Sequence, residues 1–290
     1  LATGNTIIMK PSEVTSLSIL NWINVTGGDM PPGVMNVVTG FGKDAGEALV
    51  KHPDVPMITF TGSVVTGKRI ARLASENLKK VSLELGGKDP VIVCDDADIN
   101  VAAKGTSWGG FVNAGQVCTS VERVYVYEAI ADRFTEALVD EAKKVKLGDP
   151  MNKGTNVGPM SSKMQFTNTI NKVDLAKKEG ARVLTGGQRS GKFEKGYFYE
   201  PTIFDQVTHG MDIVTEESFS PVIPIQRIKS MDEAIQMANS TKYGLGCTIF
   251  TRDIERALKG ADNIKAGTIC INNPLMENIA APFGGMKQSG

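Results

Sequence analysis

The chain has 290 residues, which is enough for one large or two medium domains, and its 32 lysines and arginines balance its 32 aspartates and glutamates. A chain without net charge has no overall field that attracts nucleic acid or an anionic membrane, and no apolar stretch approaches the roughly 20 residues of a spanning helix, so we expect neither partner. Four scattered cysteines without a C-x-x-C pair suit a reducing, cytoplasmic setting, and two histidines exclude a histidine-rich metal site, so we expect no metal.

The first part of the chain alternates short apolar runs with amphipathic stretches. The apolar runs predict buried strands at residues 6–9, 34–38, 57–60 and 81–85. Helices are expected over residues 15–27, 43–51 and 63–73, the last opened by Ser63. This order predicts parallel β-α-β units, and the pair Gly86-Gly87 marks a boundary between domains of residues 1–86 and 87–290.

The same alternation restarts beyond Gly87. Strands are predicted at residues 90–94, 123–127, 182–184, 248–250 and 268–271, helices over 98–110, 129–145 and 161–179, and a surface loop or hairpin over 186–196. The predicted fold class is therefore α/β, with two Rossmann-like domains built on open parallel sheets. A strand begins almost at Leu1 and no closing element precedes Gly290, so we expect a fragment truncated at both ends.

Cys118 is the strongest candidate for a nucleophile. It follows residues 113–117, a glycine-containing turn after which a thiol can face a cleft while nearby backbone N–H groups face an oxyanion. A buried structural cysteine is the alternative, because burial is the usual fate of this residue. For Cys94, Cys247 and Cys270, which lie in apolar strand patterns, the structural role is favoured.

Glu84 is a candidate general base at the end of an apolar strand. The carboxyl ends of strands in open α/β sheets face ligand crevices, and partial burial would raise the pKa of a glutamate toward the range in which it can deprotonate water. A solvated glutamate at the end of a strand is the alternative reading of the same pattern.

Two segments after strands are candidates for binding a nucleotide. Gly62 and Ser63 form a strand-to-helix turn that suits a phosphate held by backbone amides, while Lys10 and Glu13 could bind ribose hydroxyls or could simply be solvated. The glycine run at residues 40–46 is one residue too long for the G-x-G-x-x-G fingerprint, so it could be only a loop.

Six short motifs then occur in a characteristic order. In their order and approximate spacing they resemble the aldehyde dehydrogenase superfamily along the whole chain, and the resemblance implies the later part of the cofactor domain and nearly all of the catalytic domain. The motifs are Lys10-Pro11-Ser12-Glu13, Phe60-Thr61-Gly62-Ser63, Glu84-Leu85-Gly86-Gly87-Lys88, Gly115-Gln116-Val117-Cys118, Glu216-Glu217-Ser218-Phe219 and Pro282-Phe283-Gly284-Gly285.

The resemblance implies a role for each candidate residue in oxidising a small aldehyde to a carboxylic acid with NAD. The Cys118 thiolate would attack the aldehyde, and Glu84 would activate the water that hydrolyses the resulting thioester. The cofactor contacts would be Glu217 on the nicotinamide ribose with Phe219 beside it, Ser63 on the pyrophosphate, and Lys10 with Glu13 on the adenosine ribose. Glu13 should favour NAD over NADP, the alternative cofactor, because a carboxylate repels a 2′-phosphate.

The resemblance also identifies a substrate loop and two differences from the family pattern. Residues 273–278 correspond to the loop that lines the substrate tunnel of the family, where Glu277 either attracts an amino- or trimethylammonium-aldehyde or faces solvent. Ser220 stands where family members usually have glycine. The family's asparagine oxyanion donor would lie upstream of Leu1, so residues 1–290 alone should oxidise aldehydes poorly, whereas the full-length protein should be a homo-oligomer.

Two other functions remain open. A CoA-acylating semialdehyde dehydrogenase of the same fold would release the thioester to a thiol, but Glu84 argues against it because those relatives typically lack a carboxylate there. A catalytically inactive binding or structural derivative is the other, and the presence of Cys118, Glu84 and Glu217 argues against that.

Overall fold

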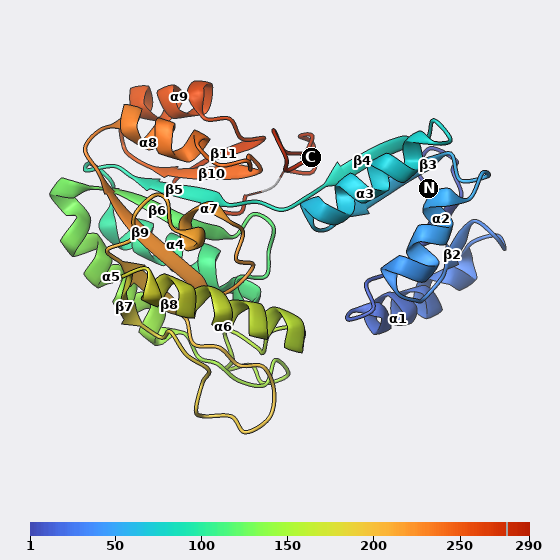
Figure 1. The fold of residues 1–290 in the computed structure, drawn as a ribbon, viewed down its shortest axis with the longest axis horizontal. Coiled ribbons are helices and arrows are strands. Elements are labelled where there is room, and N and C mark those ends of the chain that lie inside the picture. Colours follow the sequence, from blue (N-terminus) through green and yellow to red (C-terminus); the bar gives the residue numbers. More distant parts are fainter. Residues whose placement is uncertain (277) are drawn as a thin grey trace. The chain divides into compact units, whose positions relative to one another are not determined.

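The computed structural model describes residues 1–276 and 278–290, which form two compact units, Leu1–Leu83 and Glu84–Gly290. Figure 1 shows helices alternating with strands along the chain, and the predicted α/β class is confirmed.

The first unit contains short strands and three α-helices. Strand β1 (Ile7–Met9) pairs in parallel with β2 (Met35–Val37), and β3 (Met57–Thr61) forms a second two-stranded sheet with β4 (Lys80–Glu84). The helices are α1 (Ser16–Thr26), α2 (Glu47–Lys51) and α3 (Val64–Ser75). Helix α3 begins where the Ser63 hydroxyl accepts the backbone N–H of Thr66, which supplies a partner for one of the free amides of its first turn.

The second unit is built on a seven-stranded sheet in the order β11-β10-β5-β6-β9-β8-β7. All neighbouring strands are parallel except β7, an edge strand that runs antiparallel to β8 and departs from the predicted all-parallel arrangement. The strands are β5 (Asp89–Val93), β6 (Val121–Tyr127), β7 (Arg182–Thr185), β8 (Thr202–Asp205), β9 (Val222–Ile228), β10 (Gly246–Phe250) and β11 (Thr268–Ile271).

Helices cover both faces of this sheet. Ile249 and Phe250 are successive residues of β10 and therefore point to opposite faces. Gly105 packs on Phe250 and Gly260 packs on Ile249, which places α4 (Ile99–Phe111) on one face and α9 (Ile254–Asn263) on the other. The remaining helices are α5 (Ala131–Lys144), α6 (Lys163–Lys178), α7 (Asp212–Thr215) and α8 (Met231–Asn239).

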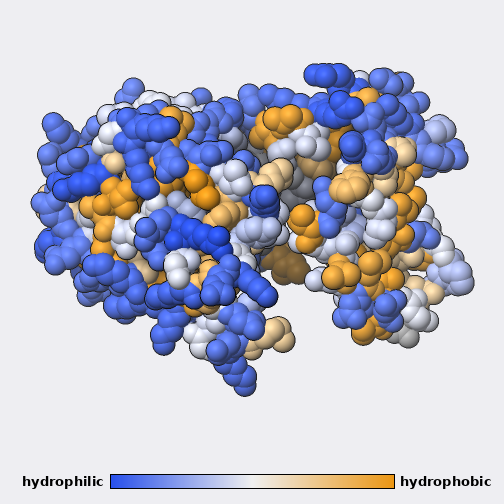
Figure 2. Space-filling model, turned by 60° about the horizontal axis from the view of Figure 1, so that its bottom comes forward, coloured by the Kyte–Doolittle hydropathy of each residue, from blue (hydrophilic) through white to orange (hydrophobic). Residues whose placement is uncertain are grey.

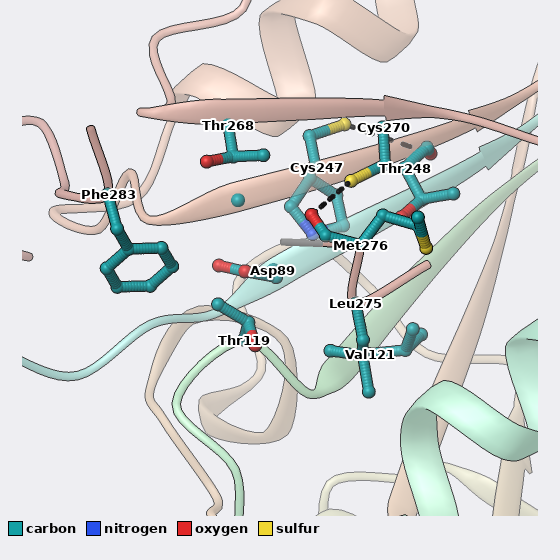
Figure 3. A pocket seen from close by; sticks show the side chains of 12 residues that line it. Asp89, Thr119, Val121, Cys247, Thr248, Thr268, Cys270, Leu275, Met276 and Phe283 are labelled. Atoms are coloured by element: carbon teal, nitrogen blue, oxygen red, sulfur yellow. Dashed lines mark hydrogen bonds between the residues drawn. The ribbon is translucent and has the colours of Figure 1, made fainter. Parts of the chain in front are cut away.

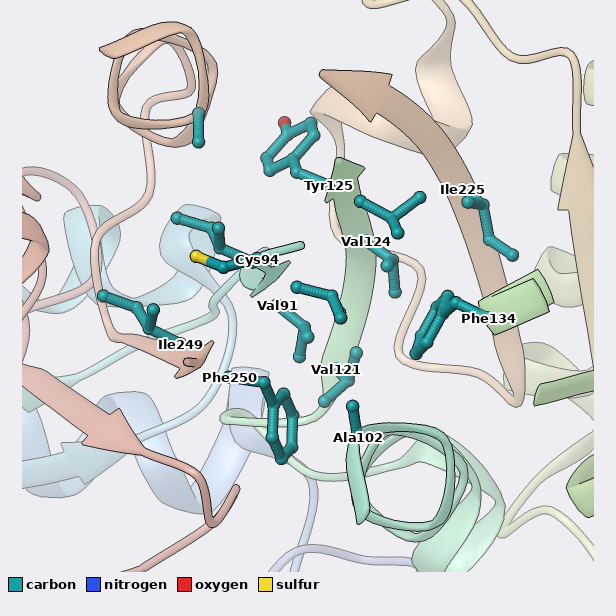
Figure 4. Close-up of a cluster of buried hydrophobic side chains, with 14 of the residues drawn as sticks. Val91, Cys94, Ala102, Val121, Val124, Tyr125, Phe134, Ile225, Ile249 and Phe250 are labelled. Carbon is teal, nitrogen blue, oxygen red and sulfur yellow. The ribbon is translucent and has the colours of Figure 1, made fainter. Parts of the chain in front are cut away.

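The main hydrophobic core lies between the sheet and these helices. Figure 4 shows Val91, Val124 and Ile225 from three adjacent strands, with Phe134 of α5 packed near them. Strands buried on both faces are expected to be apolar almost throughout, and β5 and β10 are buried at every position.

The surface mixes hydrophilic side chains with patches of hydrophobic ones on the face that Figure 2 shows. Among the described residues, no helix combines the length and the apolar character needed to cross a membrane.

One feature of the sheet determines where the candidate site forms. Strands β5, β6 and β9 are adjacent and parallel, so their amino ends lie side by side. The segments that precede these strands contain Lys88, Cys118 and Glu217, and they therefore enter the sheet from the same side.

Candidate functional site

The turn before Cys118 has an unusual backbone. Asn113, Ala114 and Gly115 all have positive φ values, of 52°, 57° and 68°. Left-handed conformations cost energy in non-glycine residues and persist only when their surroundings fix them. Asn113 and Gln116 provide that restraint, because each side-chain amide donates to the other residue's carbonyl at 3.0 Å.

Gly115 is required by a close approach of two backbones. A Cβ atom at this position would collide with the carbonyl of Ser220, so the turn can lie against the loop before β9 only if residue 115 is glycine. Ser220 is buried, and its hydroxyl has no hydrogen-bond partner among the described residues. Family members usually have glycine at position 220, and with serine there the backbone still lies against Gly115.

The Cys118 thiol is half-buried and faces backbone N–H groups. The amides of Thr119 and of Cys118 itself stabilise the thiolate, but burial, followed by the charge of Asp89, raises the pKa of the thiol above its ordinary value of 9.0. The amides are suited to an oxyanion, whereas the thiol is predominantly protonated at neutral pH.

The other three cysteines have surroundings typical of structural residues. Cys94 and Cys247 are buried, and burial raises the pKa of Cys94 to about 11 and that of Cys247 further still. The Cys270 thiol is half-buried and lies 3.7 Å from the carbonyl oxygen of Met276. None of these three cysteines directly follows a run of left-handed residues like that at residues 113–115.

Alkylation of Cys118 by iodoacetamide, without aldehyde or cofactor, should therefore depend steeply on pH. Because the pKa is raised, the thiolate fraction should be small at about pH 7 and should keep increasing beyond pH 9.0. The rate can be followed by mass spectrometry of the peptide that contains Cys118, with Cys118→Ala as the control for labelling elsewhere. A rate that reaches its plateau below about pH 8 would show a thiolate stabilised by groups other than those described.

Glu84 ends β4 and has a partly buried carboxyl group. Its Oε2 atom is buried without a hydrogen-bond partner among the described residues, and a Cβ atom at Gly284 would lie 3.6 Å from its Oε1 atom. Burial raises the pKa of Glu84. A carboxylate with a free, poorly solvated oxygen is suited to accept a proton from water.

Glu217 lies against the glycine pair that follows Glu84. Its Oε1 atom accepts the backbone N–H of Gly87 at 3.2 Å, and a Cβ atom at Gly86 would collide with its carboxylate. Burial, then the charge of Glu122, raises the pKa of Glu217 to about 7, although the Gly87 amide and Lys88 oppose the shift. Gly86 therefore makes room for the Glu217 carboxylate, whereas a Cβ atom at Gly87 would collide with the backbone carbonyl of Cys118.

A small cavity lies beside the nucleophile turn. Its volume is about 20 Å³, which is enough for a water molecule and too small for an aldehyde chain. Figure 3 shows Asp89, Thr119 and the ring of Phe283 around it, together with Cys247 and Cys270. Thr119 directly follows Cys118, so the cavity adjoins the thiol-bearing segment.

The first unit contains the other four predicted site residues. Lys10 is not free, because its Nζ atom donates to the carbonyls of Pro11 at 2.6 Å and of Gly40 at 3.0 Å. Its stem also passes Gly46, so it connects the glycine run at residues 40–46 with the end of β1. Glu13 is exposed.

Gly62 and Ser63 form the turn at the start of α3. A Cβ atom at Gly62 would lie 2.5 Å from the ring of Phe60, so the close packing of this ring requires glycine at position 62. The Ser63 hydroxyl caps the helix and donates to the Thr66 hydroxyl at 3.0 Å. The amides of this first helical turn remain suited to a phosphate.

A model of the aldehyde dehydrogenase family matches residues 1–290. The chain belongs to this family. The resemblance inferred from the six motifs is therefore confirmed.

Two curated aldehyde dehydrogenases illustrate the relationship. Aminoaldehyde dehydrogenase 1, peroxisomal, from Malus domestica is 43% identical over 291 residues, and the chloroplastic betaine aldehyde dehydrogenase from Atriplex hortensis is 42% identical over 291 residues. Each alignment covers 100% of this chain and 58% of the relative. The chain thus spans less than two thirds of their length.

Solved aldehyde dehydrogenases have the same fold. A betaine aldehyde dehydrogenase from Staphylococcus aureus in complex with NAD+ matches with a TM-score of 0.97 and 39% identity, over 100% of this chain and 60% of that one. Lactaldehyde dehydrogenase from Escherichia coli matches with a TM-score of 0.96 and 39% identity, over 99% of this chain and 60% of that one.

Three buried charged residues of the second unit were not among the site residues predicted from the sequence. Asp89 is buried, burial raises its pKa well above the ordinary value, and it lies close enough to raise the pKa of Cys118. Lys88 and Glu122 form a buried ion pair with Nζ and Oε2 2.7 Å apart. Charged residues at the start of otherwise apolar strands were the signal that could have identified all three.

Proposed function

We propose that the protein oxidises an aldehyde to a carboxylic acid, with NAD as the hydride acceptor. The observation that carries the proposal is the half-buried Cys118 thiol, which follows a left-handed turn and faces two backbone N–H groups. Membership of the aldehyde dehydrogenase family gives this thiol a carbonyl as its natural target.

NAD is the proposed cofactor, and the residues present suit it. The half-buried Glu217 carboxylate, in a cradle that a Cβ atom at Gly86 would fill, can accept hydrogen bonds from ribose hydroxyls, with Phe219 beside it. In the first unit, the α3 amides at Gly62 and Ser63 would hold the pyrophosphate, and Lys10 with Glu13 the adenosine ribose. The similar structure from Staphylococcus aureus is described as an NAD+ complex, which supports this assignment.

The two domains divide this work in our proposal. Residues 1–86 form the C-terminal part of an NAD-binding domain, and residues 87–290 form the catalytic domain that contains the thiol. The proposal also includes a cytoplasmic location and a homo-oligomeric full-length protein, which the sequence and the family resemblance support. Several relatives are named as peroxisomal or chloroplastic forms.

Cys118 performs the first step. Its thiolate adds to the carbonyl carbon of the aldehyde, and the electron pair of the C=O bond moves to oxygen, where the amides of Cys118 and Thr119 would stabilise the charge. NAD, when bound, supplies the chemistry that removes hydride from this adduct. The carbonyl carbon is then held on Cys118 as a thioester.

Glu84 completes the reaction. Its carboxylate accepts a proton from water as the water oxygen attacks the thioester carbonyl, and the C–S bond then breaks to release the acid and the thiolate. The buried Oε2 atom without a partner is the acceptor available for this proton, and its raised pKa brings Glu84 closer to the working pH.

A cationic aldehyde is the proposed substrate class. Glu277, which the sequence suggested as the group that attracts an amino- or trimethylammonium-aldehyde, lies outside the described residues. The names of the relatives, aminoaldehyde and betaine aldehyde dehydrogenases, support the same class. Charge pairing between a carboxylate and an ammonium group is the physical basis of the preference.

The test is aldehyde-dependent NADH formation by the full-length protein. We expect NADH to form from aldehydes. The kcat/KM should be higher with NAD than with NADP, because Glu13 repels a 2′-phosphate. Activity that requires CoA would refute the hydrolytic function.

The substrate preference has its own test. We expect a higher kcat/KM for an aminoaldehyde than for a neutral aldehyde of equal length, and Glu277→Gln should reduce this preference for the cationic aldehyde. An unchanged ratio of the two kcat/KM values in Glu277→Gln would refute the role of that residue.

A further inference from the structure

The loop that contains Glu217 is bound to the rest of the unit through its backbone. The N–H groups of Ser218 and Phe219 donate to the two carboxylate oxygens of Glu122, each at 2.7 Å. The carbonyls of the same two residues accept from the side-chain amide of Gln165, at 3.0 and 2.8 Å. We call this arrangement the amide clamp: all four polar backbone groups of two successive residues are bound by two side chains.

Lys88 pairs with the Glu122 carboxylate inside the protein. Its ammonium group lies 2.7 Å from Glu122 Oε2 and donates to the Ser218 hydroxyl at 2.9 Å, and the two charged side chains are 0% and 3% exposed. Hydrogen bonds to a charged acceptor are about twice as strong as those between neutral groups. A buried ion pair contributes little to stability by itself, because desolvation offsets its attraction, so these residues call for another explanation.

The geometry of the loop indicates what the clamp does. Phe219 has a φ of 49°, a left-handed conformation that is costly for an aromatic residue and that needs fixed surroundings. Glu217 directly precedes the clamped pair, and its Oε1 atom accepts the backbone N–H of Gly87 at 3.2 Å. One hydrogen bond to an amide does not fix a side chain, so its orientation depends on the loop.

We propose that Glu122 is a positioning residue for the cofactor: by binding the amides of Ser218 and Phe219, it orients Glu217 and Phe219 for the nicotinamide ribose. The inference rests on the proposed function, because it takes Glu217 as a ribose-binding group. The proximity of Glu122 to Glu217 agrees with it, since the charge of Glu122 helps to raise the pKa of Glu217.

The test replaces Glu122 with glutamine in the full-length protein. A glutamine side chain has one oxygen where the carboxylate has two, so one of the two amides would face an NH2 group and lose its acceptor. We expect the KM and the calorimetric Kd for NAD to rise by on the order of tenfold or more, since small misplacements of positioning groups have large effects. The KM for the aldehyde and the alkylation rate of Cys118 should stay within about twofold, because the hydrogen bonds that hold the nucleophile turn, between Asn113 and Gln116, do not involve Glu122.

The double variant Lys88→Met/Glu122→Gln separates positioning from stability. It removes both buried charges, so its melting temperature should exceed that of the single variant, whose Lys88 is left unpaired. The raised Kd for NAD should persist. If the double variant recovers both stability and NAD affinity, Glu122 merely neutralises Lys88 and the inference is wrong.

Two reference variants complete the design. Asp205→Asn removes the carboxylate that pairs with Arg182 at 2.8 Å at the far end of the sheet, and should change stability without changing NAD affinity. Glu217→Gln should weaken NAD binding. If Glu217→Gln weakens binding and Glu122→Gln does not, the positioning role is refuted while the proposed function stands. If Glu217→Gln has no effect, the assigned ribose contact fails and the inference fails with it.

Discussion

Cys118→Ala is expected to abolish aldehyde-dependent NADH formation by the full-length protein. The substitution removes the sulfur that forms the covalent adduct, so the loss in kcat should be at least about a thousandfold. The backbone amides remain, and the small side chain leaves the left-handed turn intact. Initial rates with saturating NAD and a reactive aldehyde provide the measurement.

The other cysteines serve as matched controls. Cys94→Ala, Cys247→Ala and Cys270→Ala should retain NADH formation, because none of these cysteines directly follows the left-handed turn and burial raises the pKa of each. Cys94→Ala and Cys247→Ala remove buried volume and should lower the melting temperature. An equal loss of activity in Cys270→Ala would place the nucleophile at β11 instead.

Glu84→Gln is expected to slow steady-state turnover by about a hundredfold to ten-thousandfold while preserving a burst of NADH. Hydride leaves before the thioester is hydrolysed, so each active site should form one NADH and then wait for water without a base. Stopped-flow absorbance at the NADH band measures both the burst and the slow phase.

The control for this experiment is Glu136→Gln, an exposed glutamate of α5. It should change neither the burst nor the steady rate. If Glu84→Gln loses the burst although NAD still binds, Glu84 acts before or during hydride transfer and the assignment as the hydrolytic base is wrong. A steady rate equal to that of the unchanged protein would exclude any proton transfer by this residue.

Much of the fold could be predicted because apolar runs and helix caps are local signals. Strands β5 and β10, which are buried at every position and mostly apolar, were predicted at residues 90–94 and 248–250 and lie at 89–93 and 246–250. Strand β9 was missed because Pro224 and Arg227 interrupt its apolar pattern. Helices α8 and α9 were also missed, although Ser230 and Asp253 cap them and would have indicated both.

Some residues of the candidate site have a local signal in the sequence and others do not. The turn before Cys118 could be predicted from its glycine, and Glu84 from its place at the end of a strand. Glu122 could not, because its partners Ser218 and Phe219 are 96 and 97 residues away and no local pattern joins them. The antiparallel direction of β7 likewise depends on pairing with β8 rather than on the sequence of β7 itself.

The shared edge of β5, β6 and β9 has a consequence for folding. Gly87 and Glu217, which are 130 residues apart, meet only after β9 has joined β6, so the site depends on contacts of very long sequence separation. Such contacts carry the largest loop-closure entropy and form late. During refolding, the return of NAD binding should therefore lag behind the return of helical structure, and recovered activity marks completion of the central sheet.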